Sequence, residues 1–316
     1  MDAIERIPPR TDAIERIPPW LGALVDAHRH GLYDMSPDWS LAGVPVEKWS
    51  EDSRFLDHER RTKGLFGDAL RAALLPWVEF SRAEGIGTVL DFSGKHARGD
   101  VEHVYRAAGM RSHEPVFWSS WSPDACPAPA VMILPDEREL GAEAAAAARS
   151  FLAATPGGRI TLHAGESDAR MQIGKSRLGW SIVEWLARES LLDARTLLVH
   201  GNALAPTDYE LVGEAGASVV LCPLTRVALH NPAPLVPTRV RIFFGTDAPL
   251  VSGSRSLIDQ AVAEARRWIA QGSSGIAAAE RAAAALTRPL EVEPLEVSRA
   301  DSLLASFLFD NFLKVR

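Results

Sequence analysis

Short apolar segments alternate with longer segments of helical periodicity over most of the chain. The short segments are rich in Val, Ile, Leu and Phe, so we expect them to form strands, and we expect the longer segments to form helices. The expected strands are 23–28, 86–92, 115–121, 130–134, 159–163, 196–200, 217–222 and 241–246. The expected helices are roughly 66–84, 100–109, 139–154, 178–191, 207–215 and 255–271. This alternation is typical of repeated βα units in a parallel sheet.

The expected strands are apolar almost throughout, which indicates a parallel sheet that is buried on both faces. Eight such strands favour closure into a (β/α)8 TIM barrel, an α/β fold that commonly fills about 250 residues. The chain has 316 residues, a length that agrees with one barrel and equally with two average domains. A doubly wound open sheet is the structural alternative.

Three segments fall outside this alternation. DAIERIPP occurs at 2–9 and again at 12–19, so we interpret 1–20 as an N-terminal extension that contains a local duplication. The stretch 31–65 is expected to be a long loop that could serve as a lid over the barrel mouth. We expect the barrel itself to span 21–286. The remaining residues, 287–316, are expected to form a tail whose amphipathic helix packs on the outside of the barrel.

Charge, hydropathy and cysteine content indicate which partners, location and metal ligands to expect. The chain carries 34 Lys and Arg against 41 Asp and Glu, and its net charge of −7 disfavours nucleic acid and anionic membranes as partners. No apolar run is long enough to span a bilayer, and the first residues lack the apolar centre of a signal peptide, so we expect a cytoplasmic protein. Because only two cysteines occur, Cys126 and Cys222, any metal site must use His, Asp and Glu.

Several expected strands end in side chains that can bind a metal. The first strand ends in His28 and His30, and the two-residue period of a strand points both imidazoles to one side. His163, His200 and Asp247 stand at the ends of three later strands. In a parallel barrel these ends meet at the carboxyl face, where active sites form. Since imidazole and carboxylate ligands suit zinc or ferrous iron, the predicted ligands of one divalent ion are His28, His30, His163 and Asp247.

Each of these residues also has a purely structural interpretation. A lone histidine at a strand end is more often a hydrogen-bonded core residue than a ligand, and only the complete set favours a site. Glu166 follows His163 by three residues and is predicted to transfer a proton to a leaving group. The alternative for Glu166 is an ordinary loop acid or a charge at a helix N-terminus.

The substrate pocket offers four candidate residues. Trp118 and Trp121 follow the third strand, where they could stack on a planar heterocycle or simply fill the barrel. Arg226 could pair with a carboxylate or phosphate of the substrate, or it could tie down its own loop. Asn202 lies directly after the His200-Gly201 pair and is a further candidate for substrate binding.

Five short motifs in this chain resemble the amidohydrolase superfamily. They are VDAHRH at 25–30, LHAGES at 162–167, LLVHGNAL at 197–204, SVVLCPLT at 218–225 and FFGTDAPL at 243–250. Their order and barrel spacing resemble the mononuclear aminohydrolase branch in particular, which includes cytosine, guanine, adenosine and S-adenosylhomocysteine deaminases and the triazine chlorohydrolases.

The resemblance implies a barrel that holds one divalent ion, with zinc favoured and iron as the alternative, on the four predicted ligands. It implies proton transfer by Glu166, and contact of His200 with the attacking oxygen or the developing oxyanion. Binuclear members usually carry a carboxylated lysine on strand four, and AVMILP contains no lysine or glutamate, which favours one ion. Many relatives add a β-sandwich built from both chain ends. We do not expect one here, because only about twenty residues precede the first strand.

Two departures from the family pattern concern the substrate. CPLTR places Arg226 where CPxSN members carry a small Asn, and GTDAPL has one aspartate, as in the cytosine and triazine group. The expected reaction is hydrolytic deamination of a purine-like or pyrimidine-like heterocycle by hydroxide on the ion, with Asp247 accepting the proton of the water. The alternatives are hydrolysis of a linear or cyclic amide, dechlorination of a triazine-like ring, and a catalytically inactive metal-binding or ligand-binding barrel. The apolar faces of 299–316 are compatible with a homo-oligomer.

Overall fold

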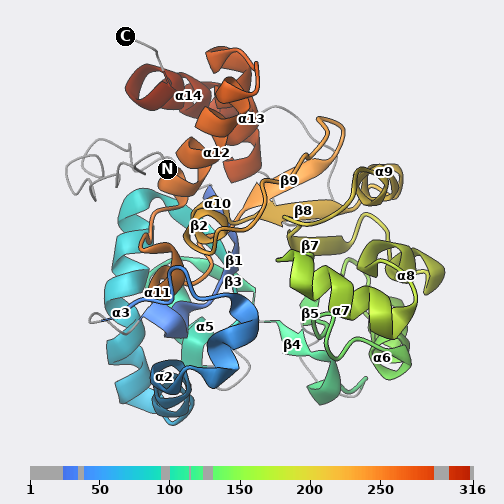
Figure 1. Cartoon of the computed structure of the whole chain (residues 1–316). Coiled ribbons are helices and arrows are strands. Elements are labelled where there is room, and N and C mark those ends of the chain that lie inside the picture. Colours follow the sequence, from blue (N-terminus) through green and yellow to red (C-terminus); the bar gives the residue numbers. More distant parts are fainter. Residues whose placement is uncertain are drawn as a thin grey trace.

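Every strand that the sequence predicts is present, and the strands pair in parallel within one sheet (Figure 1). The computed structural model describes residues 24–34, 39–93, 100–113, 115–123, 131–287 and 299–313. The duplicated segment at 1–20 lies outside these residues. The strands are β1 (Leu24–Arg29), β2 (Ile86–Asp91), β3 (Arg111–His113), β4 (Val116–Phe117), β5 (Val131–Ile133), β6 (Arg159–Ala164), β7 (Thr196–His200), β8 (Ser218–Leu221) and β9 (Arg241–Phe244).

The third strand of the barrel is split into two short strands, β3 and β4, which lie at the two edges of the sheet. The order of the sheet is β3-β2-β1-β9-β8-β7-β6-β5-β4, so β3 pairs with β2 at one edge and β4 pairs with β5 at the other. Only positions 114 and 115 separate β3 from β4 in the sequence, so the chain itself joins the two edges. The fold is therefore the expected α/β barrel with eight strand positions, and not a doubly wound open sheet.

The third strand differs from its expected span of 115–121. It begins earlier, as β3, and ends at Phe117, where the 3₁₀ turn η4 (Trp118–Ser120) starts. Pro115 stands between the two halves, and proline has no amide hydrogen to donate to a neighbouring strand. The residues 118–121 thus lie beyond the strand in which they were expected.

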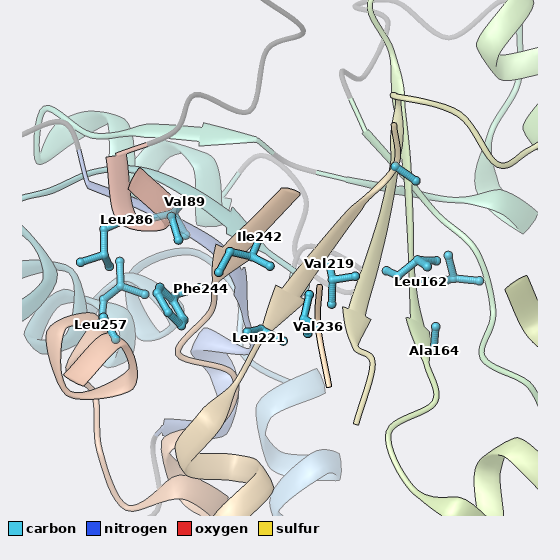
Figure 2. Close-up of a cluster of buried hydrophobic side chains, with 14 of the residues drawn as sticks. Val89, Leu162, Ala164, Val219, Leu221, Val236, Ile242, Phe244, Leu257 and Leu286 are labelled. Carbon is cyan, nitrogen blue, oxygen red and sulfur yellow. The ribbon is translucent and has the colours of Figure 1, made fainter. Parts of the chain in front are cut away.

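Alternating side chains of the strands build two separate apolar layers. Phe243 belongs to the cluster inside the barrel, whereas its neighbour Phe244 belongs to the cluster between sheet and helices. Figure 2 shows part of this outer cluster, where Phe244 lies near Leu257 of α12 (Leu257–Ala270) and Leu286 of α13 (Gly275–Thr287). Because both faces of each strand are buried, the strands are apolar almost throughout. The inner cluster comprises Val25, Ala27, Leu90, Phe92, Val131, Ile133, Leu197, Val199, Val220, Cys222 and Phe243.

Helical periodicity predicted most of the outer helices correctly. The expected helices appear as α3 (Gly67–Glu84), α5 (Asp100–Ala107), α6 (Ala142–Ala154), α8 (Ile182–Arg188), α9 (Pro206–Glu214) and α12. The sequence did not predict α7 (Asp168–Leu178), α10 (Pro223–Ala228), α11 (Pro249–Ser252) or α13. The reason is clear for α7, which buries only Arg170 and Gly174 and so has no apolar stripe to detect.

The stretch 31–65, which was expected to be a long loop, contains helical elements. This segment contains the 3₁₀ turns η2 (Gly31–Asp34) and η3 (Val46–Glu51) and the helix α2 (Ser53–Lys63), whose first turn is capped by the Asp52 carboxylate. Phe55 of α2 packs into a small cluster with Leu250 and Val251 of α11. Because α11 follows Asp247 directly, the segment is attached beside the carboxyl face of the barrel.

The C-terminal region packs on the outer helices. Helix α14 (Arg299–Leu308) and the π turn η5 (Phe309–Leu313) contact α13 and bury Leu304, Leu308 and Leu313 in the outer cluster. The division of the chain at 20/21 and 286/287 remains a prediction. Among the described residues, no helix combines the length and the apolar character that a membrane crossing requires.

Candidate metal centre and active site

The four predicted ligands meet at the carboxyl face of the barrel. His28 Nε2 lies 3.4 Å from Asp247 Oδ1, and His30 Nε2 lies 3.8 Å from the same oxygen. His30 Nε2 is also 3.4 Å from Nε2 of His163. Residues from β1, from the end of β6 and from the turn after β9 therefore share one small volume, although more than two hundred positions separate His28 from Asp247.

His200 belongs to the same group. Two overlapping sets of side chains each place one donor atom per residue within 4.8 Å of one another: His28 with His30 and His163, and His28 with His200 and Asp247. The imidazole of His200 lies nearly parallel to that of His163, with ring centroids 5.4 Å apart. The site thus contains five potential ligands, and His28 is common to both sets.

Burial keeps these imidazoles neutral. Loss of hydration lowers the pKa of His28 to about 3, and it lowers the pKa values of His30, His163 and His200 as well. Both ring nitrogens of His28 and Nδ1 of His200 are buried without a hydrogen-bond partner among the described residues. A buried polar atom without a partner is costly, and a neutral imidazole nitrogen is a good donor to a dication. The donor set therefore fits a divalent metal ion.

Asp247 supplies the negative charge of this group. Burial alone would raise the pKa of its carboxyl, but the side-chain contact with His28 lowers this pKa well below its usual range. Its backbone is held to β1, because the amide of Asp247 donates to His28 O over 3.0 Å and the amide of His30 donates to Asp247 O over 3.0 Å. The carboxylate is thus ionised and fixed beside the imidazoles.

Two residues of the site have left-handed backbone conformations. The φ angle is 76° at His200 and 59° at Asp247, a region that non-glycine residues seldom occupy. Such conformations persist only where the surrounding structure holds them, and they concentrate at functional sites. Here they turn the chain sharply at the ends of β7 and β9.

Glu166 lies at the edge of this group, directly before helix α7. Its Oε1 is 3.8 Å from Nε2 of His200, and its side chain is buried. Burial and, next, the charge of Asp247 raise the pKa of Glu166 to about 8. Its carboxyl group is therefore largely protonated at neutral pH and can donate a proton beside the metal group.

The structure places Asn202 beside Glu166, and its predicted contact with substrate stays a prediction. The Asn202 amide donates a hydrogen bond to the backbone carbonyl of Glu166. The guanidinium of Arg226 lies 3.9 Å from the buried carboxylate of Glu264 in α12, and a role in substrate binding stays a prediction. Trp118 and Trp121 both pack against the outer cluster, and Trp121 meets Phe151 of α6 edge-on. Their predicted role in stacking on a substrate stays a prediction.

Sequence reasoning missed two residues that contact the site. Tyr33 of η2 stacks on His30, with ring centroids 5.2 Å apart. Glu137 is buried in the turn after β5 and accepts a hydrogen bond over 2.5 Å from the amide of Gly165, next to Glu166. Tyr33 follows His30 closely and could have been found by its position, whereas Glu137 lies in the charged stretch PDERE, which is indistinguishable from a surface turn.

Solved structures of other proteins share this fold. An adenosine deaminase from Xanthomonas campestris with bound zinc has a TM-score of 0.63 and 18% identity, with 83% of this chain and 66% of that chain covered. A variant of an atrazine chlorohydrolase from Arthrobacter aurescens TC1, complexed with zinc and atraton, gives a TM-score of 0.65, 16% identity, and coverage of 90% and 78%. A guanine deaminase from E. coli has a TM-score of 0.58 and 15% identity, with 91% of this chain and 79% of that chain covered.

Other comparisons gave no match. No protein-family profile and no curated protein sequence matches the chain. The chain spans about two thirds of the length of the adenosine deaminase. At these identities the similarity to solved structures is one of fold, and it bears out the barrel that the five sequence motifs implied.

Proposed function

We propose that this protein is a metal-dependent hydrolase of the amidohydrolase superfamily that deaminates a small nitrogen heterocycle. One observation carries the proposal. Glu166, an acid that is protonated near neutral pH, lies 3.8 Å from His200, within a group of four further side chains whose donor atoms suit a divalent ion. A proton donor next to a metal-ligand set is the arrangement that hydrolysis of an electrophilic carbon requires.

The metal would be held by His28, His30, His163 and Asp247. We propose zinc, because the set combines neutral imidazoles with one carboxylate and because two of the structures that share the fold contain zinc. A bound dication supplies a water molecule whose pKa is lowered from about 15.7 toward roughly 7, so that a nucleophile is available at neutral pH. No lysine occurs in β5 or beside it, in 130–135, which favours a single ion.

The protein's own groups divide the proton transfers between them. Asp247 is ionised and accepts a proton from the attacking water. Glu166 donates its proton to the ring nitrogen as the water oxygen bonds to the neighbouring carbon. His200, fixed beside Glu166, donates a hydrogen bond to the oxygen as charge develops there. Asp247 then passes the proton it accepted to the amino group, the carbon–nitrogen bond breaks and ammonia leaves. The new hydroxyl returns a proton to Glu166 and the ring nitrogen keeps the proton it received, so the net reaction consumes one water and restores both carboxyl groups.

Ammonia release tests this proposal. Zinc-loaded protein would be incubated with aminated purines, pyrimidines and triazines, and with chlorinated triazines, while ammonia and chloride are measured. We expect ammonia from at least one aminated ring, and loss of that activity in Glu166→Gln. Chloride release without ammonia would move the reaction to hydrolytic dechlorination, for which the shared fold with an atrazine chlorohydrolase is the supporting observation. Zinc binding without turnover of any compound would favour an inactive binding barrel.

A further inference from the structure

The first strand does not keep a regular alternation to its end. Val25 and Ala27 both belong to the inner cluster, so an unbroken two-residue period would turn His28 outward. The pairing of β1 with β2 is irregular between Asp26 and Arg29. An extra residue of this kind reverses the direction of the side chains that follow it. His28 accordingly faces inward.

The side chains around this irregularity confirm the reversal. The imidazole of His28 meets Phe92 of the inner cluster edge-on, with ring centroids 4.3 Å apart. The guanidinium of Arg29 points the other way and lies 3.9 Å from the centre of the Trp77 ring in α3. The irregularity is therefore what turns the first histidine of the pair into the site.

Asp26 and Arg29, which flank the irregularity, form a buried ion pair on the helix-covered side of the strand. Arg29 Nη2 lies 2.7 Å from Asp26 Oδ2, Arg29 Nε donates to the same oxygen over 2.9 Å, and both side chains are fully buried. In a regular strand, residues three apart would point to opposite faces, so this contact exists only because the strand is irregular. A buried ion pair repays the loss of hydration only when further hydrogen bonds complete it.

Thr246 provides those further bonds. Its hydroxyl donates to Asp26 Oδ2 over 2.6 Å, and its backbone amide donates to Asp26 Oδ1 over 3.0 Å. The amide of His28 also approaches Asp26 Oδ1, at 3.4 Å. Thr246 directly precedes Asp247, whose φ angle of 59° is strained. Asp26 thus ties the backbone of one predicted ligand, His28, to the backbone next to another.

We propose that Asp26, Arg29 and Thr246 form a positioning network that sets the spacing of His28 and Asp247 from behind the strand. The bonds that connect Asp26 to the ligand segments come from the backbone amides of His28 and Thr246, so the network acts through the backbone. This inference rests on the metal centre of the proposed function, but it does not depend on which substrate is hydrolysed. Its consequence is that the affinity for zinc depends on a hydroxyl on the outer side of the barrel.

The test compares two substitutions at Thr246 in the full chain. Thr246→Val keeps the shape and the backbone amide but removes the hydroxyl donor, whereas Thr246→Ser keeps the donor. Zinc affinity would be measured by competition with a chromophoric chelator, and thermal unfolding would be measured on the metal-free forms. We expect Thr246→Val to weaken zinc binding by about 10- to 100-fold, as is usual for residues that orient ligands, and Thr246→Ser to stay close to wild type.

Ser181→Ala is the matched control, because it also removes a hydroxyl that donates to a buried carboxylate, that of Asp208, but at the N-cap of outer helix α8 (Ile182–Arg188). It should lower thermal stability without changing zinc affinity.

If Thr246→Val lowers stability but binds zinc like wild type, the network is merely structural and the inference is overturned. If the wild-type protein itself binds no zinc, both this inference and the metal centre of the proposed function are wrong. If Thr246→Val does not fold, Arg29→Lys replaces it in the same assay. This substitution keeps the charge but loses the second bond to Asp26, and we expect it to weaken zinc binding. An unchanged affinity for zinc would contradict the inference.

Discussion

The side-chain amide of Asn202 donates a hydrogen bond over 3.0 Å to the backbone carbonyl of Glu166. Neighbouring backbone bonds extend this contact, because the amide of Gly201 donates to Ala164 O over 2.9 Å and the amide of Ala203 donates to Gly165 O over 2.8 Å. The turn after β7 therefore holds the turn after β6, which carries Glu166. This arrangement leads us to predict that Asn202 positions Glu166.

Asn202→Ala should reduce kcat by about 10- to 100-fold, because a small displacement of a proton donor is costly, and should leave zinc affinity unchanged. Steady-state kinetics on whichever heterocycle releases ammonia would measure the effect. A raised KM with an unchanged kcat would contradict the positioning role and would support the substrate contact that the sequence suggested.

Metal removal should abolish activity and lower stability. At a free zinc concentration about 100-fold above its Kd, the ion should add about 2.7 kcal/mol to the free energy of unfolding. Thermal unfolding with and without zinc, after treatment with a chelator, would measure this difference. His163→Ala should eliminate most of the zinc effect, because it removes a ligand.

His103→Ala is the control for that experiment, since His103 is exposed on α5 and lies outside the metal group. Its response to zinc should equal that of wild type. An equal response in both histidine variants would show that zinc binds somewhere other than the predicted centre.

Gly245→Ala should damage both folding and the metal centre. A Cβ atom at this position would lie 2.7 Å from the backbone oxygen of His28 and 2.8 Å from its Cβ, where no flexible side chain can move aside. We expect a loss of about 1 to 3 kcal/mol in the free energy of unfolding, which is the usual cost of overpacking, together with weaker zinc binding. Gly141→Ala, where the added atom meets nothing within 4 Å, should cost less, about 0.5 to 1 kcal/mol, because only a favoured N-cap residue of α6 is lost. Urea unfolding of the two variants would separate these outcomes, and equal stability would contradict the close approach.

Glu84, which lies away from the metal centre, should make the free energy of unfolding depend on pH. This buried residue at the end of α3 accepts hydrogen bonds from the amides of Leu257 and Ile258 at the start of α12, and burial raises its pKa from 4.5 to about 7. Its stabilising contribution is complete below about pH 4.5 and is lost as the pH rises to about 7, because the unfolded chain then ionises first. The difference corresponds to about 3 kcal/mol.

Glu84→Gln removes this titration and keeps the shape of the side chain. Urea unfolding at pH 5 and pH 7.5 should therefore show a smaller decrease for Glu84→Gln than for wild type, since all other titrating groups are common to both. A decrease of the same size in the two proteins would mean that the pKa of Glu84 is not raised.

The sequence predicted the barrel because its signal is local and repeated. Each strand carries its own apolar run, and each of the six expected helices carries its own apolar spacing. The exceptions are equally local in cause. Helix α7 lacks an apolar stripe. The buried face of α2 has helical spacing, but of its three buried residues, Phe55, His58 and Thr62, only Phe55 is apolar. Trp118, Trp121 and Arg226 are candidates for the pocket because they follow strands, and this stays a prediction. Their contacts with the outer cluster and with Glu264 come from packing between segments that are distant in the chain.

By itself the sequence determined which side chains stand at strand ends, and therefore that His28, His30, His163, His200 and Asp247 belong to one face of a parallel barrel. Only the tertiary structure decided how these side chains are held. The reversal within β1, the ion pair of Asp26 with Arg29, and the raised pKa of Glu166 all arise from contacts between segments that are distant in the chain, or from burial that no local pattern specifies. Strand periodicity is a property of neighbouring residues, whereas the position and protonation of a buried group are set by everything that surrounds it in space.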